Sequence, residues 1–443
     1  MKLTRFILLL IATSILLMVI AFYNGYAIVD GDTNAYIYSG FSNAALKDRP
    51  PFYGLFIRYS SFWASLWFTV FFQSLLVSYL LLKYIDLIQK KATGFSQALT
   101  TVIVITSFTC VSWIASFLMP DIFAGILLLA TLLFISVSGE RKGALAGYAL
   151  IIFFCMLVHN SHLLIVVLFS AVLAIWAVLK KQKRILRRCI VLVSISCLSW
   201  ISLCSVNKIN GYGFTFSPSG HVFIMGRLSE MGILKVYLSD NCAGKNMKLC
   251  SYKDSLPVYS WDFIWQRYSP FYKTGGWDSS KAEYTDIIHD IFTRPKYIKM
   301  LAQKSAVGTL RTLGQINIPD RYAEYGRESG PGQVVSMYFN DDMNEYVESL
   351  QNNSWLSGTT FNIFYCLFFI LSTVWILFNR KNINEDHLFI YGCVLLFFVI
   401  NAFVMSTFSA VLARYQTRIS WMIPATNAIF IVKHYWNKYQ STD

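Results

Sequence analysis

Residues 162–188 read HLLIVVLFSAVLAIWAVLKKQKRILRR, an apolar stretch that is followed at once by a cluster of lysines and arginines. A helix of about 20 apolar residues is long enough to cross the hydrocarbon core of a bilayer. Basic residues collect at the cytoplasmic ends of such helices. The stretch therefore indicates a membrane-spanning helix whose C-terminal end faces the cytoplasm.

The composition extends this interpretation to most of the chain. Of its 443 residues, 55% are hydrophobic and only 14% are charged, and the mean hydropathy is +0.48. So few charges cannot cover the surface of a soluble protein of this length. We expect a mainly α, polytopic helical membrane protein with about ten transmembrane helices. The expected spans lie near residues 6–28, 62–85, 98–118, 122–138, 144–159, 162–179, 189–206, 361–379, 388–409 and 418–434.

Basic residues in the short loops predict the orientation of these spans. When ten spans are counted, Lys90, Lys91, Arg380, Lys381 and the run 180–188 all fall on one side of the membrane. Both chain ends are then cytoplasmic. Because these flanks account for most of the net charge of +14, the charge indicates topology and contact with anionic lipid. We expect no nucleic-acid partner.

Two long segments are expected on the outer side of the membrane, the loop 29–61 and the stretch 207–357. The second is long enough to form a domain of its own, and we expect it to be an inserted, mostly helical outer domain. Helices are expected after the turn at Ser217 and Pro218, over 279–292, and from Arg294, where a proline occupies the first turn. The predicted organisation is 1–206 as an N-terminal membrane module of seven helices, 207–357 as an extracytoplasmic domain, and 358–443 as a C-terminal membrane module of three helices.

Two of the nine cysteines differ from the others in their surroundings. Cys242 and Cys250 lie in a polar, turn-rich stretch of the outer segment, whereas the others lie in or beside apolar spans, where cysteine acts as a small packing residue. An oxidising compartment would let the pair close a short loop. A zinc site is the alternative, but no further Cys or His follows at ligand spacing. We predict a disulfide.

The first outer loop carries the best candidate site. Asp30 and Asp32 follow the first span directly, where desolvation makes charge expensive, so they indicate a site rather than an ordinary loop. On an extended segment, residues two apart share a face. Two such carboxylates could hold a divalent cation, or divide the roles of general base and electrostatic partner. The alternative is an Asx turn at the exit of the first helix.

Further polar residues occupy the other turns on the predicted outer side. Each is individually ordinary, since Asp at a helix start or His at a helix end commonly caps the helix. Together they predict a pocket in which arginines bind a phosphate diester and a carboxylate activates a hydroxyl. The residues concerned are Asp121 between the third and fourth spans, His159 and His162 between the fifth and sixth, and Arg414, Tyr415 and Arg418 between the ninth and tenth.

Four motifs occur in a characteristic order along the chain. They are the acids Asp30 and Asp32, the stretch Arg49-Pro50-Pro51-Phe52-Tyr53, the turn acid Asp121, and Arg414-Tyr415 followed by Pro424 in the last span. This order resembles the GT-C superfamily of multi-spanning glycosyltransferases, which use polyprenyl-phosphate-linked sugars as donors on the outer face of the membrane. The resemblance covers the membrane scaffold and not the inserted outer domain.

The resemblance implies an enzyme of the bacterial inner membrane. It would move a sugar from a lipid-linked donor to a hydroxyl of a glycan, lipid or protein acceptor, with inversion. Asp30 or Asp32 would act as general base or help to bind a divalent cation, and Asp121 would position the acceptor or share the cation. The residues expected to bind the substrate and its phosphate are Arg49, Arg58, Tyr53, His159, His162, Arg414, Tyr415 and Arg418. Many relatives carry their soluble domain at the C-terminus, so the acceptor cannot be transferred from the resemblance.

Two other classes of protein remain open. A polysaccharide polymerase or ligase of the envelope would show similar spans, a large outer loop and outer arginines, but it need not have an essential acid in the first loop. A flippase or carrier of lipid-linked saccharides is the second class. Against it, no charge lies deep within a predicted span, and no pair of broken spans occupies symmetric positions.

Overall fold

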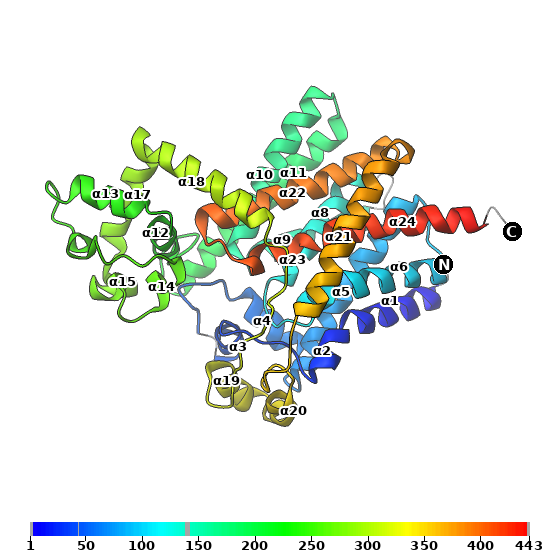
Figure 1. The fold of residues 1–443 in the computed structure, drawn as a ribbon, viewed down its shortest axis with the longest axis horizontal. Helices are drawn as coiled ribbons and strands as arrows, with labels where there is room; N and C mark the ends of the chain where they lie inside the picture. The colour runs from blue at the N-terminus through cyan, green and yellow to red at the C-terminus, as the bar shows by residue number, and fades with distance from the viewer. Residues whose placement is uncertain (1–2, 43, 138–141, 441–443) are drawn as a thin grey trace.

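The computed structural model describes residues 3–42, 44–137 and 142–440, and this part of the chain is almost entirely helical (Figure 1). The side chain of Asp278 is also outside the description. A bundle of helices carries α1 and α24 at one end, and a smaller group of helices lies beyond the other end. The helices of the bundle are α1 Leu3–Leu17, α2 Val19–Asn24, α5 Leu66–Gln89, α6 Phe95–Phe108, α7 Val111–Ala115, α8 Ile122–Ser136, α9 Lys142–Val158, α10 Asn160–Leu179, α11 Lys183–Ile209, α21 Thr359–Asn379, α22 Glu385–Phe408, α23 Ala413–Ser420 and α24 Met422–Gln440.

Five of the described helices are long and apolar enough to cross a membrane, namely α5, α10, α11, α22 and α21 with its extension to Asn382. The prediction of ten spans is therefore supported only in its coarser form, a polytopic helical protein. The first expected span is divided at Met18, and the third is divided between α6 and α7. Four further apolar helices, α1, α6, α8 and α9, have 17 residues or fewer. At about 1.5 Å per residue, the shortest of these cover less than the ~30 Å of hydrocarbon.

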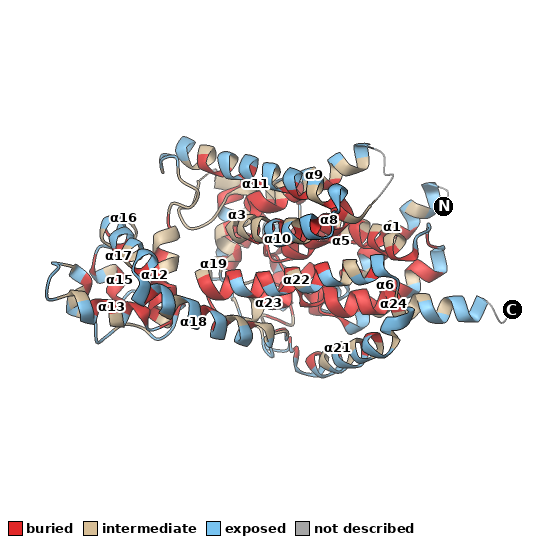
Figure 2. Cartoon of the chain, turned by 90° about the horizontal axis from the view of Figure 1, so that it is seen from above, coloured by how far each residue is buried: buried red, intermediate tan, exposed pale blue. Residues whose placement is uncertain are grey.

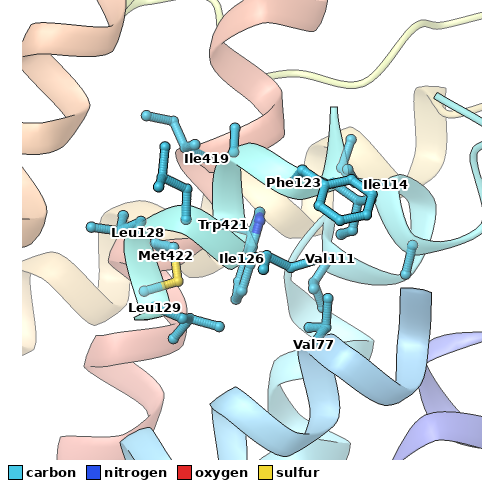
Figure 3. Close-up of a cluster of buried hydrophobic side chains, with 14 of the residues drawn as sticks. Val77, Val111, Ile114, Phe123, Ile126, Leu128, Leu129, Ile419, Trp421 and Met422 are labelled. Carbon is cyan, nitrogen blue, oxygen red and sulfur yellow. The ribbon is translucent and has the colours of Figure 1, made fainter. Parts of the chain in front are cut away.

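Helix α8 lies in the centre of the bundle rather than at its surface. All its side chains from Ile122 to Ile135 are buried, as expected for a helix that is apolar on every face. It packs against α5, α9, α11, α22 and α23. Figure 3 shows the indole of Trp421 against this helix, beside Ile126 and Val77. The exposed faces of α11 and α21 lie on the outside of the bundle (Figure 2), so α8 carries its N-terminal residue, Asp121, into the middle of the molecule.

The outer stretch between α11 and α21 is divided between two hydrophobic cores. Residues 220–301, which we call the outer module, form a core of their own. Residues that follow, such as Ile318, Val335 and Tyr346, pack instead on the core of the bundle. The helices of the outer module are α12 Gly220–Glu230, α13 Ile233–Asn241, η1 Lys248–Tyr252, α14 Ser260–Trp265, α15 Pro270–Lys273, α16 Gly276–Ser279, α17 Lys281–Thr293 and the start of α18 Pro295–Leu313. After it come α19 Gly330–Tyr338, η2 Asn340–Asp342 and α20 Met343–Glu348. The helices expected after Ser217, over 279–292 and from Arg294 are thus confirmed.

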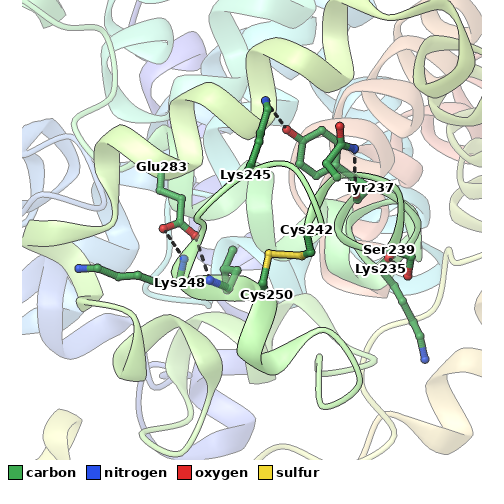
Figure 4. The surroundings of a disulfide bond; sticks show 10 residues. Lys235, Tyr237, Ser239, Cys242, Lys245, Lys248, Cys250 and Glu283 are labelled. Atoms are coloured by element: carbon green, nitrogen blue, oxygen red, sulfur yellow. Dashed lines mark hydrogen bonds between the residues drawn. A yellow bond between two sulfur atoms is a disulfide. The ribbon is translucent and has the colours of Figure 1, made fainter.

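The predicted disulfide between Cys242 and Cys250 is present, with the two Cα atoms 5.7 Å apart (Figure 4). It closes the loop between α13 and η1. The carboxylate of Glu283 on α17 accepts the backbone N–H groups of Lys248 and Leu249, each at 3.0 Å. The loop is therefore fixed both to α13 and to α17.

Arg227 on α12 joins the outer module to α22. Its side chain is buried, its Nε donates to the carbonyl oxygen of Ser406, and its Nη1 pairs with Glu230 at 2.9 Å. Gly308 on α18 lies against the same arginine and Ser406, where a Cβ atom would come within 3.0 Å of the guanidinium. The outer module is thus attached at the end of α22 that lies nearest to Arg414.

Candidate functional site

The segment that leads to Asp30 is held on both sides by backbone and side-chain hydrogen bonds. Ile28 forms a short parallel bridge with Phe117, in which the Ile28 N–H donates to Ser116 and the Leu118 N–H donates to Ile28, each at 2.9 Å. The buried amide of Gln351 accepts the N–H of Val29 at 3.0 Å and donates to its carbonyl oxygen at 2.8 Å. The chain therefore reaches Asp30 in one fixed position.

Asp30 and Asp32 form an Asx turn, which is the alternative that was weighed against an extended segment. Oδ1 of Asp30 accepts the N–H of Asp32 at 3.1 Å, and its backbone oxygen accepts the N–H of Thr33 at 2.9 Å. This Asx turn starts α3 (Thr33–Ser42). The turn does not separate the two carboxylates, because both reach the same arginine.

Arg414 on α23 lies between three carboxylates. Its Nη1 is 3.2 Å from Oδ1 of Asp30, its Nη2 is 3.3 Å from Oδ2 of Asp32, and its Nε is 4.0 Å from Oδ2 of Asp121. Asp121 is only 5% exposed, whereas the two loop acids keep about a third of their side-chain surface. The predicted convergence of the first loop, the third turn and the last outer turn is therefore present in the structure.

Arg49 is a second arginine that contacts the carboxylate of Asp32. Its Nη2 is 3.1 Å from Oδ1 of Asp32 and 2.7 Å from Oδ2 of Asp48. The guanidinium also stands 4.9 Å from the centre of the Tyr36 ring, within the range of a cation–π contact. Asp32 is thus contacted by two arginines from opposite ends of the sequence.

Two of the residues expected in the site belong to one short helix and lie outside the site. Arg58, on α4 (Phe52–Ser60), donates to the carbonyl oxygen of Gly40 at 3.0 Å and stacks over Trp63. Tyr53 is completely buried and contacts Tyr36 edge to face, and its hydroxyl donates to Gln73. Both side chains contact α3, and neither lines the cavity described below. Hydropathy does not indicate which face of α4 points toward the site, which is why both residues were expected to bind the phosphate.

The histidine turn approaches the same region from α9 and α10. Nδ1 of His159 accepts the N–H of Ser161 at 3.3 Å, so His159 caps α10 and also lines the cavity described below. His162 is fully buried and its Nδ1 donates to the carbonyl oxygen of Cys155 at 2.7 Å. Arg418 is fully buried too, and its Nη2 donates to Asn401 at 2.8 Å and to Ser161 at 3.2 Å. Arg418 and His162 therefore lie behind the wall of the cavity, not on its surface.

Burial and ion pairing move the pKa values of the two acids in opposite directions. Burial raises the pKa of Asp32, but the charges of Arg49 and Arg414 outweigh it, and the net pKa lies below the usual value. Burial also raises the pKa of Asp121, and there Arg414 and Arg418 do not compensate fully, so the net pKa lies above the usual value. Asp32 is therefore the more firmly ionised of the two.

Burial also sets the direction of the pKa shift of His159, whereas at Arg414 the neighbouring acids outweigh the effect of burial on the pKa. The pKa of His159 is far below its usual value, because burial and the nearby guanidinium of Arg418 both oppose a charged imidazole. Burial lowers the pKa of Arg414, but Asp121, Tyr415, Asp30 and Asp32 raise it well above the usual value. The site thus combines a neutral imidazole with permanently charged guanidinium groups.

A cavity of about 360 Å³ opens beside these groups. Its lining includes the charged and polar residues Asp32, Arg49, His159, Arg414 and Tyr415. The end of α22 and the stretch that enters the outer module add mainly apolar and aromatic side chains to the lining, among them Phe216, Phe223, Trp265, Met405 and Phe408. Asp30, Asp121, Tyr53, Arg58, His162 and Arg418 are not part of the lining.

Several residues of the site were missed in the sequence analysis. Tyr36 lines the cavity one helical turn after Asp32, a spacing that would have indicated it if α3 had been expected. Gln351 fixes the segment before Asp30, and Trp265 lines the apolar side. The last two lie more than 200 residues from Asp30 and Asp32 in the sequence, and no local pattern pointed to them.

Comparisons of the chain with known proteins add no relative to this description. No family model matches the sequence, and neither a curated protein nor a solved structure matches it.

Proposed function

We propose that this protein transfers a sugar from a polyprenyl-phosphate-linked donor to an acceptor hydroxyl at the outer face of a bacterial inner membrane. The observation that carries the proposal is the placement of ionised Asp32 between Arg49 and Arg414 in the lining of a cavity that also has apolar and aromatic lining residues. A lipid-linked sugar phosphate presents the same two chemical faces, an anionic sugar phosphate and an apolar chain. Arginine suits the anionic part, since its fork can engage phosphate oxygens in pairs.

The proposed reaction is a single displacement. The acceptor oxygen attacks the anomeric carbon, and the bond from that carbon to the phosphate oxygen breaks with its electron pair leaving on the phosphate. Asp32 takes the proton of the acceptor hydroxyl, and inversion at the anomeric carbon follows. Of the three acids around Arg414, only Asp32 lines the cavity, so we assign it the role of base.

Arg414 and Arg49 would stabilise the charge that develops on the leaving phosphate. Each terminal nitrogen of Arg414 that contacts an acid has a second N–H to offer. Asp30 and Asp121 would hold the guanidinium in place, which makes them positioning residues. Preorganised donors of this kind stabilise a developing charge strongly where water is scarce. Asp30 and Asp32 both pair with Arg414, so a divalent cation bound by these acids would have to displace the guanidinium.

A polymerase or ligase of envelope polysaccharide is the second candidate, and a flippase of lipid-linked saccharides is the third. Both need a site for a lipid phosphate, and the arginines serve it equally well. They differ from the proposed transferase in the need for a base, so the role of Asp32 discriminates between them.

The test compares Asp32→Asn with a matched acid-to-amide variant, Asp254→Asn, at an exposed residue that lines neither cavity. Membranes with equal amounts of each protein are incubated with a panel of radiolabelled polyprenyl-phosphate sugars, and sugar transfer is measured. Loss of a general base typically lowers the rate by about 10²–10⁴, so Asp32→Asn should be nearly inactive while Asp254→Asn keeps its activity. Full activity of Asp32→Asn would eliminate it as the base. Retained binding of the lipid without any transfer in the unaltered protein would favour the flippase.

A further inference from the structure

A second and larger cavity, of about 680 Å³, lies at the opposite end of the bundle. It is formed by the C-terminal part of α5, the end of α8, Tyr148 of α9, Arg184 of α11 and the start of α22. These are the helix ends that the basic loops predict to be cytoplasmic. The proposed transfer site does not include any of these residues.

Helix α22 contributes residues to both cavities, so the distance between them can be taken along its axis. His387 lines the second cavity and Met405 lines the first. At ~1.5 Å per residue these positions are roughly 27 Å apart along the helix axis. That distance is close to the thickness of the hydrocarbon core, about 30 Å. The two cavities are therefore separated by about the thickness of the hydrocarbon core.

The charged lining of the second cavity comprises three cations, Lys83, Lys90 and Arg184, and two carboxylates, Asp86 and Asp386. Lys90 pairs with Asp386 at 2.7 Å, and Asp86 accepts the backbone N–H of Thr93 at 2.8 Å. Within the described part of the chain, neither Lys83 nor Arg184 forms an ion pair. Both line the cavity, and Lys83 has only the ring of Phe6 as a cation–π partner. Lys83 and Arg184 therefore form no ion pair in this part of the chain, and the lining carries a net charge of +1.

Two buried polar atoms at the same cavity have no hydrogen-bond partner in the described chain. They are Nε2 of His387 and Oγ of Ser136, and both residues line the cavity. The whole His387 residue is only 4% exposed. An unpaired buried polar group is costly and indicates a missing partner. A phosphate oxygen would satisfy either group, since imidazole N–H and hydroxyl groups both donate hydrogen bonds to it.

The rest of the lining is apolar and includes Leu87, Leu133, Val137, Phe389 and Ile390. A free phosphate ion would leave this surface uncovered, whereas the first carbons of an acyl chain would cover it. Basic pockets between membrane helices on the cytoplasmic side are suited to phosphate-bearing lipid headgroups. We propose that this cavity binds the phosphate headgroup of an anionic membrane lipid between Lys83, Arg184 and His387.

The test measures lipid binding by the full-length protein in detergent. Bound lipids are counted by native mass spectrometry while phosphatidylglycerol, phosphatidylcholine or inorganic phosphate is titrated. The unaltered protein should retain phosphatidylglycerol in preference to phosphatidylcholine. The double variant Lys83→Gln/Arg184→Gln should bind phosphatidylglycerol at least ~10-fold more weakly, because it loses two charges. The matched control Arg380→Gln removes a basic residue at the same end of the bundle that does not line the cavity, and it should bind as the unaltered protein does.

Equal affinity of the double variant and the control would overturn the proposal, and so would equal retention of the two lipids. Displacement by millimolar inorganic phosphate without any preference for phosphatidylglycerol would assign the cavity to free phosphate and overturn the lipid. If the double variant does not elute as the folded protein, His387→Phe serves in its place, since it keeps a ring and removes Nε2. Sugar transfer by Asp32→Asn is measured separately, so failure of one proposal leaves the other distinguishable.

Discussion

Replacing Gly125 by alanine should destabilise the centre of the bundle. A Cβ atom at this position of α8 would lie 2.7 Å from Cζ2 and 3.0 Å from Nε1 of Trp421. Ordinary carbon contacts are about 3.5–4.0 Å, so the indole would have to move by roughly 1 Å. Trp421 is fully buried and its Nε1 donates to the carbonyl oxygen of Arg418. The indole therefore has little room to move, and Figure 3 shows apolar side chains on each side of it.

The expected magnitude follows from two opposing effects. Overpacking of a core costs about 1–3 kcal/mol, while alanine gains about 1 kcal/mol over glycine in a helix interior. The matched control is Gly147→Ala in α9, where nothing lies within 4 Å of an added Cβ. Both variants gain the helix propensity, so the difference between their unfolding free energies isolates the steric cost. We expect Gly125→Ala to be less stable than Gly147→Ala by about 1–3 kcal/mol.

The assay is unfolding of the detergent-solubilised protein by titration with a denaturing detergent. A double-mutant cycle with Trp421→Phe sharpens it, because phenylalanine has no Cζ2 or Nε1 to meet the new methyl group. Gly125→Ala should then lose most of its cost, which gives a coupling energy of about 1–2 kcal/mol. Equal stability of Gly125→Ala and Gly147→Ala, or additive effects in the cycle, would refute the reasoning.

Three further predictions concern stability. His159 is neutral in the folded protein because its pKa is lowered. Its contribution to the free energy of unfolding is therefore fully present above pH 6.5 and is lost as the pH falls below that value. Between pH 7.5 and 5.5 this loss should be about 1.4 kcal/mol, and His159→Asn should remove it. An unchanged pH dependence in that variant would contradict the assignment. Gly40→Ala should prevent the close crossing of α3 and α4, because the new Cβ would lie 2.2 Å from the carbonyl oxygen of Gly54. Thermal unfolding should show that the variant is destabilised by more than about 2 kcal/mol. A native-like Tm would be inconsistent with this crossing. Cys242→Ser/Cys250→Ser opens the disulfide loop and should lower the unfolding free energy of the outer module by about 2–3 kcal/mol. Two free thiols in the unaltered protein, found by mass spectrometry, would contradict this prediction.

The convergence of acids and arginines was predictable because it depends only on which end of a helix each residue occupies. Asp30, Asp121 and Arg414 each lie at a turn between apolar stretches, and the alternation of such turns assigns them to one side. The direction in which a side chain points depends on the rotation and packing of each helix, which hydropathy does not give. For that reason Tyr53 and Arg58, on α4, were placed in the site and lie behind it.

The outer module illustrates a second limit. Its helices were partly predictable from local patterns, but its position on α22 depends on contacts such as that between Arg227 and Ser406. These residues are 179 positions apart in the chain. No periodicity connects them, so the aromatic side of the cavity could not be predicted from the sequence.

The position of Arg414 late in the chain affects the order in which the molecule is made. Asp32 and Arg414 are separated by 382 residues, so the ribosome delivers the acids long before the guanidinium that neutralises them. A nascent chain that stops short of α23 has all three carboxylates without this counter-ion. Prematurely terminated copies should therefore assemble poorly and be degraded, even when every long apolar helix has already been inserted.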